Sequence, residues 1–254
     1  MMVPELNGGG IWAFLAALLP AFVMMAYVFW YDKVHPEPIA MLFKGFVCGI
    51  VSTAMIFSLR RYFPAYFDWA YDGDSVLDLT KTAFFYAAVP EETVKLLMLW
   101  ILVSKNPFFD ERFDGIVYAV SVSMGFAALE NVDYVYFHGG TDWGSIAAIR
   151  AVLTVPGHYI YAVAMGYFYS IAKYIPQKGW RRLWQLSFIW AVPVILHGTY
   201  DAIAINKYHN DTVNIILTIG LFAFCYTLHK LCNRLIQKQL MADCEATNKK
   251  NKLA

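Results

Sequence analysis

Charged side chains that can do chemistry interrupt an apolar stretch long enough to cross a membrane. Glu91, Glu92 and Lys95 lie inside the run of residues 83–103, which is otherwise mostly apolar. A charged residue at the centre of a membrane helix costs about 2.5–3.5 kcal/mol. Later apolar runs contain four more ionisable residues: Glu130, His158, His197 and Asp201. Groups this costly must face one another or water, so we expect one polar site inside a helix bundle.

A carboxylate and an imidazole that share one water form a general base for hydrolysis. Glu91 or Glu92 with His158 fits this role, and His197 with Asp201 fits stabilisation of the oxyanion on a peptide carbonyl. The same residue types can instead hold a divalent metal such as zinc, since two imidazoles and two carboxylates are a plausible ligand set. The candidate ligands are Glu92, Glu130, His158 and His197. The sequence has no HExxH motif, so the local signal of a zinc protease is absent. Cofactor-free and metal-dependent hydrolysis are kept as alternatives.

These residues also have structural interpretations. Glu91 and Lys95 alone are typical of a buried ion pair, and a single histidine in a membrane helix commonly bonds to a neighbouring helix. Asn131 favours a hydrogen bond between helices, Arg150 an interface anchor or the balancing of a carboxylate, and Tyr161 packing. Convergence of several ionisable groups on one site is what favours chemistry over these interpretations.

The composition is that of an integral membrane protein. Of 254 residues, 59% are hydrophobic and 15% charged, whereas soluble domains average about 45–50% and about 25%. We predict an all-α, polytopic transmembrane helix bundle with seven spans, or eight. The predicted spans are 11–31, 39–59, 83–103, 114–136, 146–171, 183–205 and 212–230. Residues 1–230 then form a single bundle domain, and residues 231–254 form a polar, lysine-rich cytoplasmic tail that we expect to be disordered.

Basic residues predict the sidedness of the bundle. With the predicted spans, most basic residues fall on one side of the membrane: Lys33, Lys105 and Arg112, those of segment 173–182, and those of the C-terminal tail. Because basic loops stay in the cytoplasm, the N-terminus is predicted outside and the C-terminus inside. The net charge of +1 gives no support to nucleic-acid binding, and the four cysteines lack the CxxC spacing of zinc or redox sites.

The depths and helical phases of the ionisable residues agree with a single site. At about 1.5 Å per residue from the middle of each run, the carboxylates and imidazoles fall in the centre or outer half of the membrane. Glu91 and Lys95 are four residues apart, as are His197 and Asp201, so each pair shares one helix face. Four helices therefore send ionisable groups to one depth.

Four motifs resemble those of the PrsW family of intramembrane proteases. Residues 90–95, Pro-Glu-Glu-Thr-Val-Lys, are similar to that family's EExxK motif. Residues 113–118 and 125–134 resemble its second motif, an FDGxxY run that leads into GFAxxEN. Pro-Gly-His at 156–158 and His-Gly-Thr-Tyr-Asp at 197–201 resemble the third and fourth. The motifs occur in the family's order and cover most of residues 83–205.

The resemblance implies a polytopic membrane peptidase distantly related to the CAAX prenyl endopeptidases. Those relatives carry EExxxR and HxxxN; here a lysine stands four residues after Glu91, and Asp201 takes the place of the asparagine. By likeness, Glu91 would activate water with His158, and Glu92 would support it. The expected catalytic residues are Glu91, Glu92, His158, His197 and Asp201, and the expected supporting residues are Lys95, Glu130 and Asn131.

The resemblance also implies a substrate class and a location. Characterised relatives cut single-pass membrane proteins such as anti-sigma factors on the outer side, and family members have been described both as metalloproteases and as glutamic proteases. We therefore expect a site-1-type endopeptidase in a bacterial inner membrane, with a membrane-anchored substrate and the lipid bilayer as partners. A proton-coupled transporter and a non-catalytic scaffold are the alternatives, although the lack of repeated halves speaks against a transporter. The oligomeric state is left open.

Overall fold

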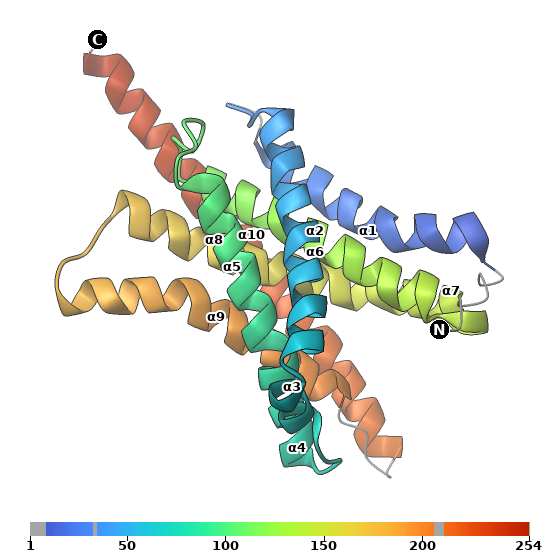
Figure 1. Cartoon of the computed structure of the whole chain (residues 1–254). Coiled ribbons are helices and arrows are strands. Elements are labelled where there is room, and N and C mark those ends of the chain that lie inside the picture. Colours follow the sequence, from blue (N-terminus) through green and yellow to red (C-terminus); the bar gives the residue numbers. More distant parts are fainter. Residues whose placement is uncertain (1–8, 33–34, 206–210, 254) are drawn as a thin grey trace.

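The computed structural model describes residues 9–32, 35–205 and 211–253, and this part of the chain is helical with no strand (Figure 1). The elements are α1 Gly10–Tyr31, α2 Ile39–Tyr62, α3 Pro64–Tyr71, α4 Val76–Lys81, η1 Thr82–Ala88, α5 Val89–Val103, α6 Asp114–Asn131, η2 Val132–Phe137, η3 Gly140–Asp142, α7 Trp143–Ile149, η4 Arg150–Thr154, α8 Val155–Tyr174, α9 Trp180–Ile205 and α10 Asp211–Leu253. The predicted all-α class is confirmed. Lys33, one of the residues used to predict sidedness, lies outside the described residues.

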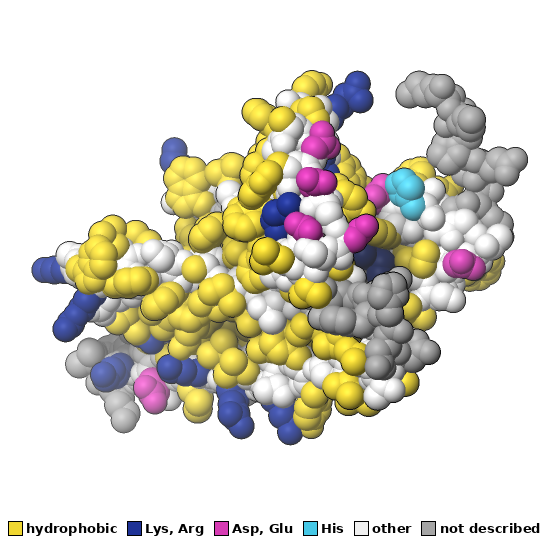
Figure 2. Space-filling model, turned by 90° about the horizontal axis from the view of Figure 1, so that it is seen from below, with side chains coloured by type: hydrophobic (Ala, Val, Ile, Leu, Met, Phe, Trp, Pro, Cys, Tyr) yellow, Lys and Arg dark blue, Asp and Glu magenta, His cyan; other side chains and the backbone are white. Residues whose placement is uncertain are grey.

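Several helices have the length and composition of membrane spans. Within the described residues there are six: Gly10–Tyr31, Ile39–Tyr62, Asp114–Phe137, Gly140–Tyr174, Trp180–Ile205 and Thr212–Lys249. They correspond to six of the seven predicted spans. The other, 83–103, is built by η1 and α5 as one continuous helix that carries Glu91, Glu92 and Lys95. The protein is thus a polytopic helical bundle, and apolar side chains cover much of the face seen in Figure 2.

The centre of the bundle is α6, whose residues are almost all buried. It packs mainly against α2 and α8 and also against α1. Close approach to α2 depends on two glycines, since a Cβ on Gly49 would overlap the carbonyl oxygen of Val122, and a Cβ on Gly125 would overlap that of Phe46. Small residues of this kind let membrane helices pack backbone to backbone. The tight packing fixes the position of Glu130 at the end of α6.

Three π-helical segments, η1, η2 and η4, lie beside the ionisable residues of α5, α6 and α8. Pro90 and Pro156 each occupy the first turn of the helix that follows such a segment. A proline has no N–H group to donate to the carbonyl oxygen four residues before it. In the wider π turn, the N–H group of the next residue donates to that oxygen instead. Accordingly, the N–H groups just after η1 and η4 donate five residues back. These wide turns set the directions in which Glu91 and His158 leave their helices.

The expectation of a disordered C-terminal tail was wrong. Helix α10 continues without a break from Asp211 to Leu253 and projects from the bundle at the end opposite α3 and α4 (Figure 1). Ile236 and Gln239 are buried, and Asp243 accepts hydrogen bonds from the backbone N–H groups of Arg112 and Phe113. The polar composition hid a helix that is anchored to the rest of the protein by these contacts.

Candidate active site

The structure brings the predicted ionisable residues together from four helices. Helix α5 supplies Glu91, Glu92 and Lys95, α6 supplies Glu130, α8 supplies His158, and α9 supplies His197 and Asp201. All of these side chains except Asp201 are buried or nearly so, with Glu92 only 1% exposed and His158 only 2%. Buried charges are stable only when they are paired and hydrogen-bonded. The contacts among these residues supply that pairing.

Lys95 connects the carboxylates to the first histidine. Its Nζ donates to Glu92 Oε1 at 2.8 Å and to His158 Nδ1 at 3.1 Å, and it lies 3.8 Å from Glu91 Oε2. The same ammonium group lies 3.9 Å from the centroid of the Phe126 ring. Because an ammonium group can only donate, neutral His158 accepts at Nδ1 and carries its proton on Nε2. Lys95 thereby orients the imidazole as well as balancing charge.

The other nitrogen of His158 faces α6. Nε2 lies 3.0 Å from Glu130 Oε2, which also accepts from Arg150 Nη2 at 2.6 Å. Arg150 Nε donates to Asn131 Oδ1 at 2.6 Å, and the Asn131 amide donates to the carbonyl of Ala17 on α1. Arg150 therefore balances a carboxylate, one of the two roles expected for it. Asn131 joins helices, as its structural interpretation anticipated.

His197 lies between two carboxylates. Nδ1 is 2.9 Å from Glu92 Oε1, and Nε2 is 3.2 Å from Asp201 Oδ2. The sequence argument paired Glu91 or Glu92 with His158, whereas the structure pairs Glu92 with His197 and His158 with Glu130. Both nitrogens of His197 are thus occupied by acceptors, and the ring holds Glu92 and Asp201 in place.

A cavity of about 340 Å³ opens beside these groups. Its polar lining includes Glu91, Glu130, His158, His197 and Asp201. It reaches the surface between helix ends, where three further lining residues are well exposed: Tyr134, Ile149 and Ile205, at 47%, 59% and 36%. Glu91 Oε2 is buried and accepts no hydrogen bond from any described residue. The cavity therefore combines room for a substrate with an acceptor oxygen that is still free.

Sequence reasoning missed two residues that line the cavity. Tyr161, assigned to packing, stacks on His197 with ring centroids 4.8 Å apart, and its buried hydroxyl has no hydrogen-bond partner among the described residues. Arg60, in the last turn of α2, reaches back so that Nη2 lies 3.5 Å from Glu91 Oε1, with its guanidinium over the ring of Tyr86. Tyr161 lies three residues after His158, and this helical spacing could have indicated that its side chain borders the site. No sequence pattern indicated a role for Arg60.

The ligand types at the site fit a divalent metal. Glu91, Glu130 and His158 each offer one ligand atom, and these atoms lie within 4.8 Å of one another. Three protein ligands with an open position are typical of catalytic zinc, and the unbonded Glu91 Oε2 is free to bind an ion. Coordination through His158 Nε2 would release its proton. This set includes Glu91 in place of the Glu92 and His197 named from the sequence.

Residues 37–228 match the model of a protein family described as PrsW family intramembrane metalloprotease. The chain belongs to this family. It is similar to Protease PrsW of Clostridioides difficile (strain 630), with 30% identity over 206 residues, which cover 81% of this chain and 84% of the relative. The Protease PrsW proteins of Geobacillus kaustophilus (strain HTA426) and Bacillus subtilis (strain 168) are 33% and 32% identical over 76% and 74% of this chain and 79% and 80% of their own lengths. No solved structure matches the chain.

Membership of the PrsW family confirms the resemblance seen in the motifs. It identifies the chain as a multi-pass intramembrane peptidase rather than a transporter or a scaffold. The ionisable residues that the structure gathers around one cavity lie within the matched range, so they are the natural candidates for its chemistry.

Proposed function

We propose that this peptidase hydrolyses a peptide bond of a membrane-anchored protein with a water activated by Glu91. The proposal rests mainly on Glu91 Oε2. This carboxylate oxygen is buried and accepts no hydrogen bond from the described residues, and Glu91 lines a cavity of about 340 Å³. A general base must have a free acceptor within reach of the proton that it removes. The other buried carboxylates of the site are already engaged, Glu92 by Lys95 and His197 and Glu130 by Arg150 and His158.

In the proposed reaction, Glu91 takes a proton from water as the water oxygen attacks the scissile carbonyl carbon. The tetrahedral intermediate then collapses, the C–N bond breaks, and Glu91 returns its proton to the leaving amine. Lys95 stabilises both glutamates and fixes the tautomer of His158. Glu92 and Asp201 hold His197, which supports the cavity wall.

The intermediate needs a donor for its oxyanion, and Tyr161 is the best placed. Its hydroxyl is buried, borders the cavity and has no partner among the described residues. His197 and Asp201, the pair expected from the sequence, are bonded to each other at 3.2 Å. A preorganised donor that has no hydrogen-bond partner before the reaction can bind the oxyanion without first breaking another hydrogen bond. We therefore assign the oxyanion contact to Tyr161.

Metal-dependent hydrolysis is the second candidate, favoured by the close approach of ligand atoms from Glu91, Glu130 and His158. These three residues would hold the ion. A divalent ion bound there would lower the pKa of a coordinated water and polarise the peptide carbonyl. Tyr161 would keep its place as the oxyanion donor, and Lys95 would continue to balance the carboxylates.

The substrate that we propose is a single-pass membrane protein, of which an anti-sigma factor is one example. The cavity is bordered by α3, by η1 and by the last residues of α9, at the end that the basic loops predict to be outside. Cleavage on the outer side of a bacterial cell membrane, with the N-terminus outside and the C-terminus in the cytoplasm, agrees with this placement.

The test is a cleavage assay with purified protein in liposomes and a pool of single-pass membrane substrates. Wild type and Glu91→Gln are compared, each with and without a strong chelator. Loss of product in Glu91→Gln with no effect of chelator supports the glutamate-activated water. Loss on chelation with recovery on added zinc supports the metal-dependent form. Undiminished cleavage by Glu91→Gln overturns both forms, because Glu91 takes part in each.

A further inference from the structure

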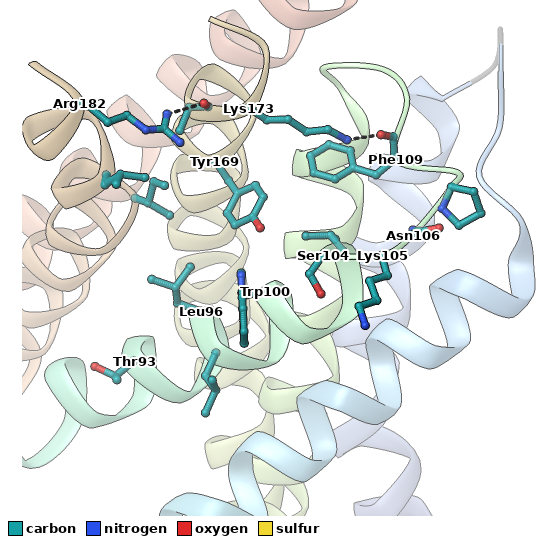
Figure 3. Close-up of a pocket in the computed structure, with 16 residues that line it drawn as sticks. Thr93, Leu96, Trp100, Ser104, Lys105, Asn106, Phe109, Tyr169, Lys173 and Arg182 are labelled. Atoms are coloured by element: carbon teal, nitrogen blue, oxygen red, sulfur yellow. Dashed lines mark hydrogen bonds between the residues drawn. The ribbon is translucent and has the colours of Figure 1, made fainter. Parts of the chain in front are cut away.

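A second and larger hollow lies on the lateral surface of the bundle, between α5, α8 and α9. We call it the α5–α9 groove; its volume is about 890 Å³ (Figure 3). It shares no lining residue with the catalytic cavity. At its inner end α9 is tied to α5 by a hydrogen bond of 2.9 Å from Trp190 Nε1 to Thr93 Oγ1. The groove is therefore a separate site.

The walls of the α5–α9 groove are apolar and open sideways. Leu97 and Trp100 of α5 are 40% and 56% exposed, and Leu186 of α9 is 43% exposed. Leu96 and Ile189 continue the two walls inward. Since these helices lie in a membrane, the opening faces lipid chains rather than water, and an acyl chain is the natural filling for such a surface.

Cationic side chains line the other end of the groove. Lys105, Lys173 and Arg182 all line it, and within the described residues no carboxylate does (Figure 3). Lys173 donates to the carbonyl of Phe109, and Arg182 donates to that of Ala172, so these bonds leave the positive charges unneutralised. The charges of Asp110 and Asp114 act on Lys173 from outside the groove lining. Neither Lys105 nor Arg182 forms an ion pair with a carboxylate among the described residues, so this end keeps a positive charge that favours an anion.

The length of the groove matches one leaflet. Thr93 and Val103 mark its extent along α5, and ten residues of helix rise about 15 Å. The hydrocarbon core of a bilayer is about 30 Å thick, so one leaflet has half that depth. Thr93 falls at the middle of the predicted span, which places Lys105 and its neighbours at the level of the lipid headgroups.

We propose that the α5–α9 groove binds one anionic phospholipid from the leaflet on the Lys105 side, the side that the basic loops predict to be cytoplasmic. Its phosphate binds at the end lined by Lys105, Lys173 and Arg182, and an acyl chain lies between Trp100 and Leu186. A substrate segment is a poorer occupant, because the groove stops at the Thr93–Trp190 bond and does not reach the cavity. The proposal does not depend on the proposed catalytic mechanism.

The experiment measures which lipid stays with the full-length protein. Protein is reconstituted in equal amounts of phosphatidylglycerol and phosphatidylcholine, extracted in mild detergent and weighed by native mass spectrometry, with titration of each lipid. Wild type should retain one phosphatidylglycerol. Lys105→Gln with Arg182→Gln should lower its affinity on the order of 30-fold, which is about 2 kcal/mol at 1.4 kcal/mol per factor of ten.

A matched control removes two charges from the same turn region outside the groove. Lys178→Gln with Arg181→Gln changes exposed residues that do not line it, and should retain the lipid as wild type does. Leu186→Trp keeps every charge but fills the opening, and should lose both lipids. Equal retention of the two lipids by wild type, equal loss in the groove and control variants, or a bound peptide in place of lipid would overturn the proposal.

Discussion

Two sets of buried carboxylates in this protein differ in what they are bonded to. The carboxylates of the cavity, Glu91, Glu92 and Glu130, face a lysine, arginines and imidazoles. A second set, Asp32, Asp114 and Asp243, accepts hydrogen bonds from backbone N–H groups instead. We call these the backbone-bound carboxylates. Burial alone therefore does not distinguish the two sets.

The two sets of carboxylates differ in whether the groups bonded to them can exchange a proton. Asp114 accepts hydrogen bonds from the backbone N–H groups of Asp110 and Glu111, and Asp243 accepts them from Arg112 and Phe113. Each carboxylate therefore fixes the path of a loop. A backbone amide cannot change its protonation state. Imidazole and ammonium groups can, and two of the carboxylates that face them, Glu91 and Glu130, border a cavity that can admit a substrate. We therefore expect proton transfer during catalysis in the first set only.

The strongest test exchanges for glutamine one glutamate of the cavity and one buried glutamate that lies outside both sets and does not border the cavity. Glu91→Gln should lower kcat for cleavage by about 10²–10⁴, the usual contribution of a general base. Glu37→Gln changes a glutamate as buried as Glu91, but one bonded to Tyr118 far from the cavity, and should leave kcat near wild type. Initial rates with a reconstituted single-pass substrate give both values. A similar loss in the two variants would contradict the distinction.

A second test removes a buried hydroxyl that borders the cavity. Tyr161→Phe should lower kcat by about 10²–10³ with little change in KM, as expected when an oxyanion donor is lost. Tyr159 is the matched control, since its hydroxyl is also buried without a partner among the described residues but does not line the cavity. Tyr159→Phe should therefore retain full activity. An equal effect of the two substitutions would mean that Tyr161 acts only through packing.

The backbone-bound carboxylates should show the opposite behaviour, with loss of stability rather than of catalysis. Asp243→Ala leaves two backbone N–H groups without their acceptor and should cost about 2–4 kcal/mol of unfolding free energy. Hydrogen exchange should also increase in residues 236–249 of α10. The cleavage rate per folded molecule should stay unchanged. An active-site defect without a fall in the melting temperature would contradict the assignment.

The smallest expected effect is a pH dependence of stability from Glu37. Burial raises its pKa to about 7, against an opposing hydrogen bond from Tyr118. The folded state therefore holds a proton that the unfolded chain releases near its ordinary pKa of 4.5, and stability should fall by about 1–3 kcal/mol as the pH rises from 4.5 to 7. Glu37→Gln should flatten this slope in detergent melts. It should not abolish the slope, because burial also raises the pKa of Asp32.

Much of this architecture could be predicted from local sequence. The apolar runs predicted seven spans, and six of these are described helices of spanning length and composition, because length and hydropathy are properties of a single segment. The spacing of four from Glu91 to Lys95 and from His197 to Asp201 predicted contacts that the helices form. The helical tail escaped prediction because polarity was taken to indicate disorder, whereas the burial of Gln239 and the hydrogen bonds that Asp243 accepts from Arg112 and Phe113 order it.

By itself, the sequence determined that the protein is a helical membrane peptidase of the PrsW family and which residue types can carry its chemistry, because motif and hydropathy are read along the chain. Only the tertiary structure decided the partners: His158 with Glu130, His197 with Glu92, and the return of Arg60 to Glu91. Partner choice between helices depends on how they rotate and how closely they approach. Between α6 and α8, for example, a Cβ on Gly166 would overlap the carbonyl oxygen of Gly115, so the close approach that joins Glu130 to His158 is a property of two helices together.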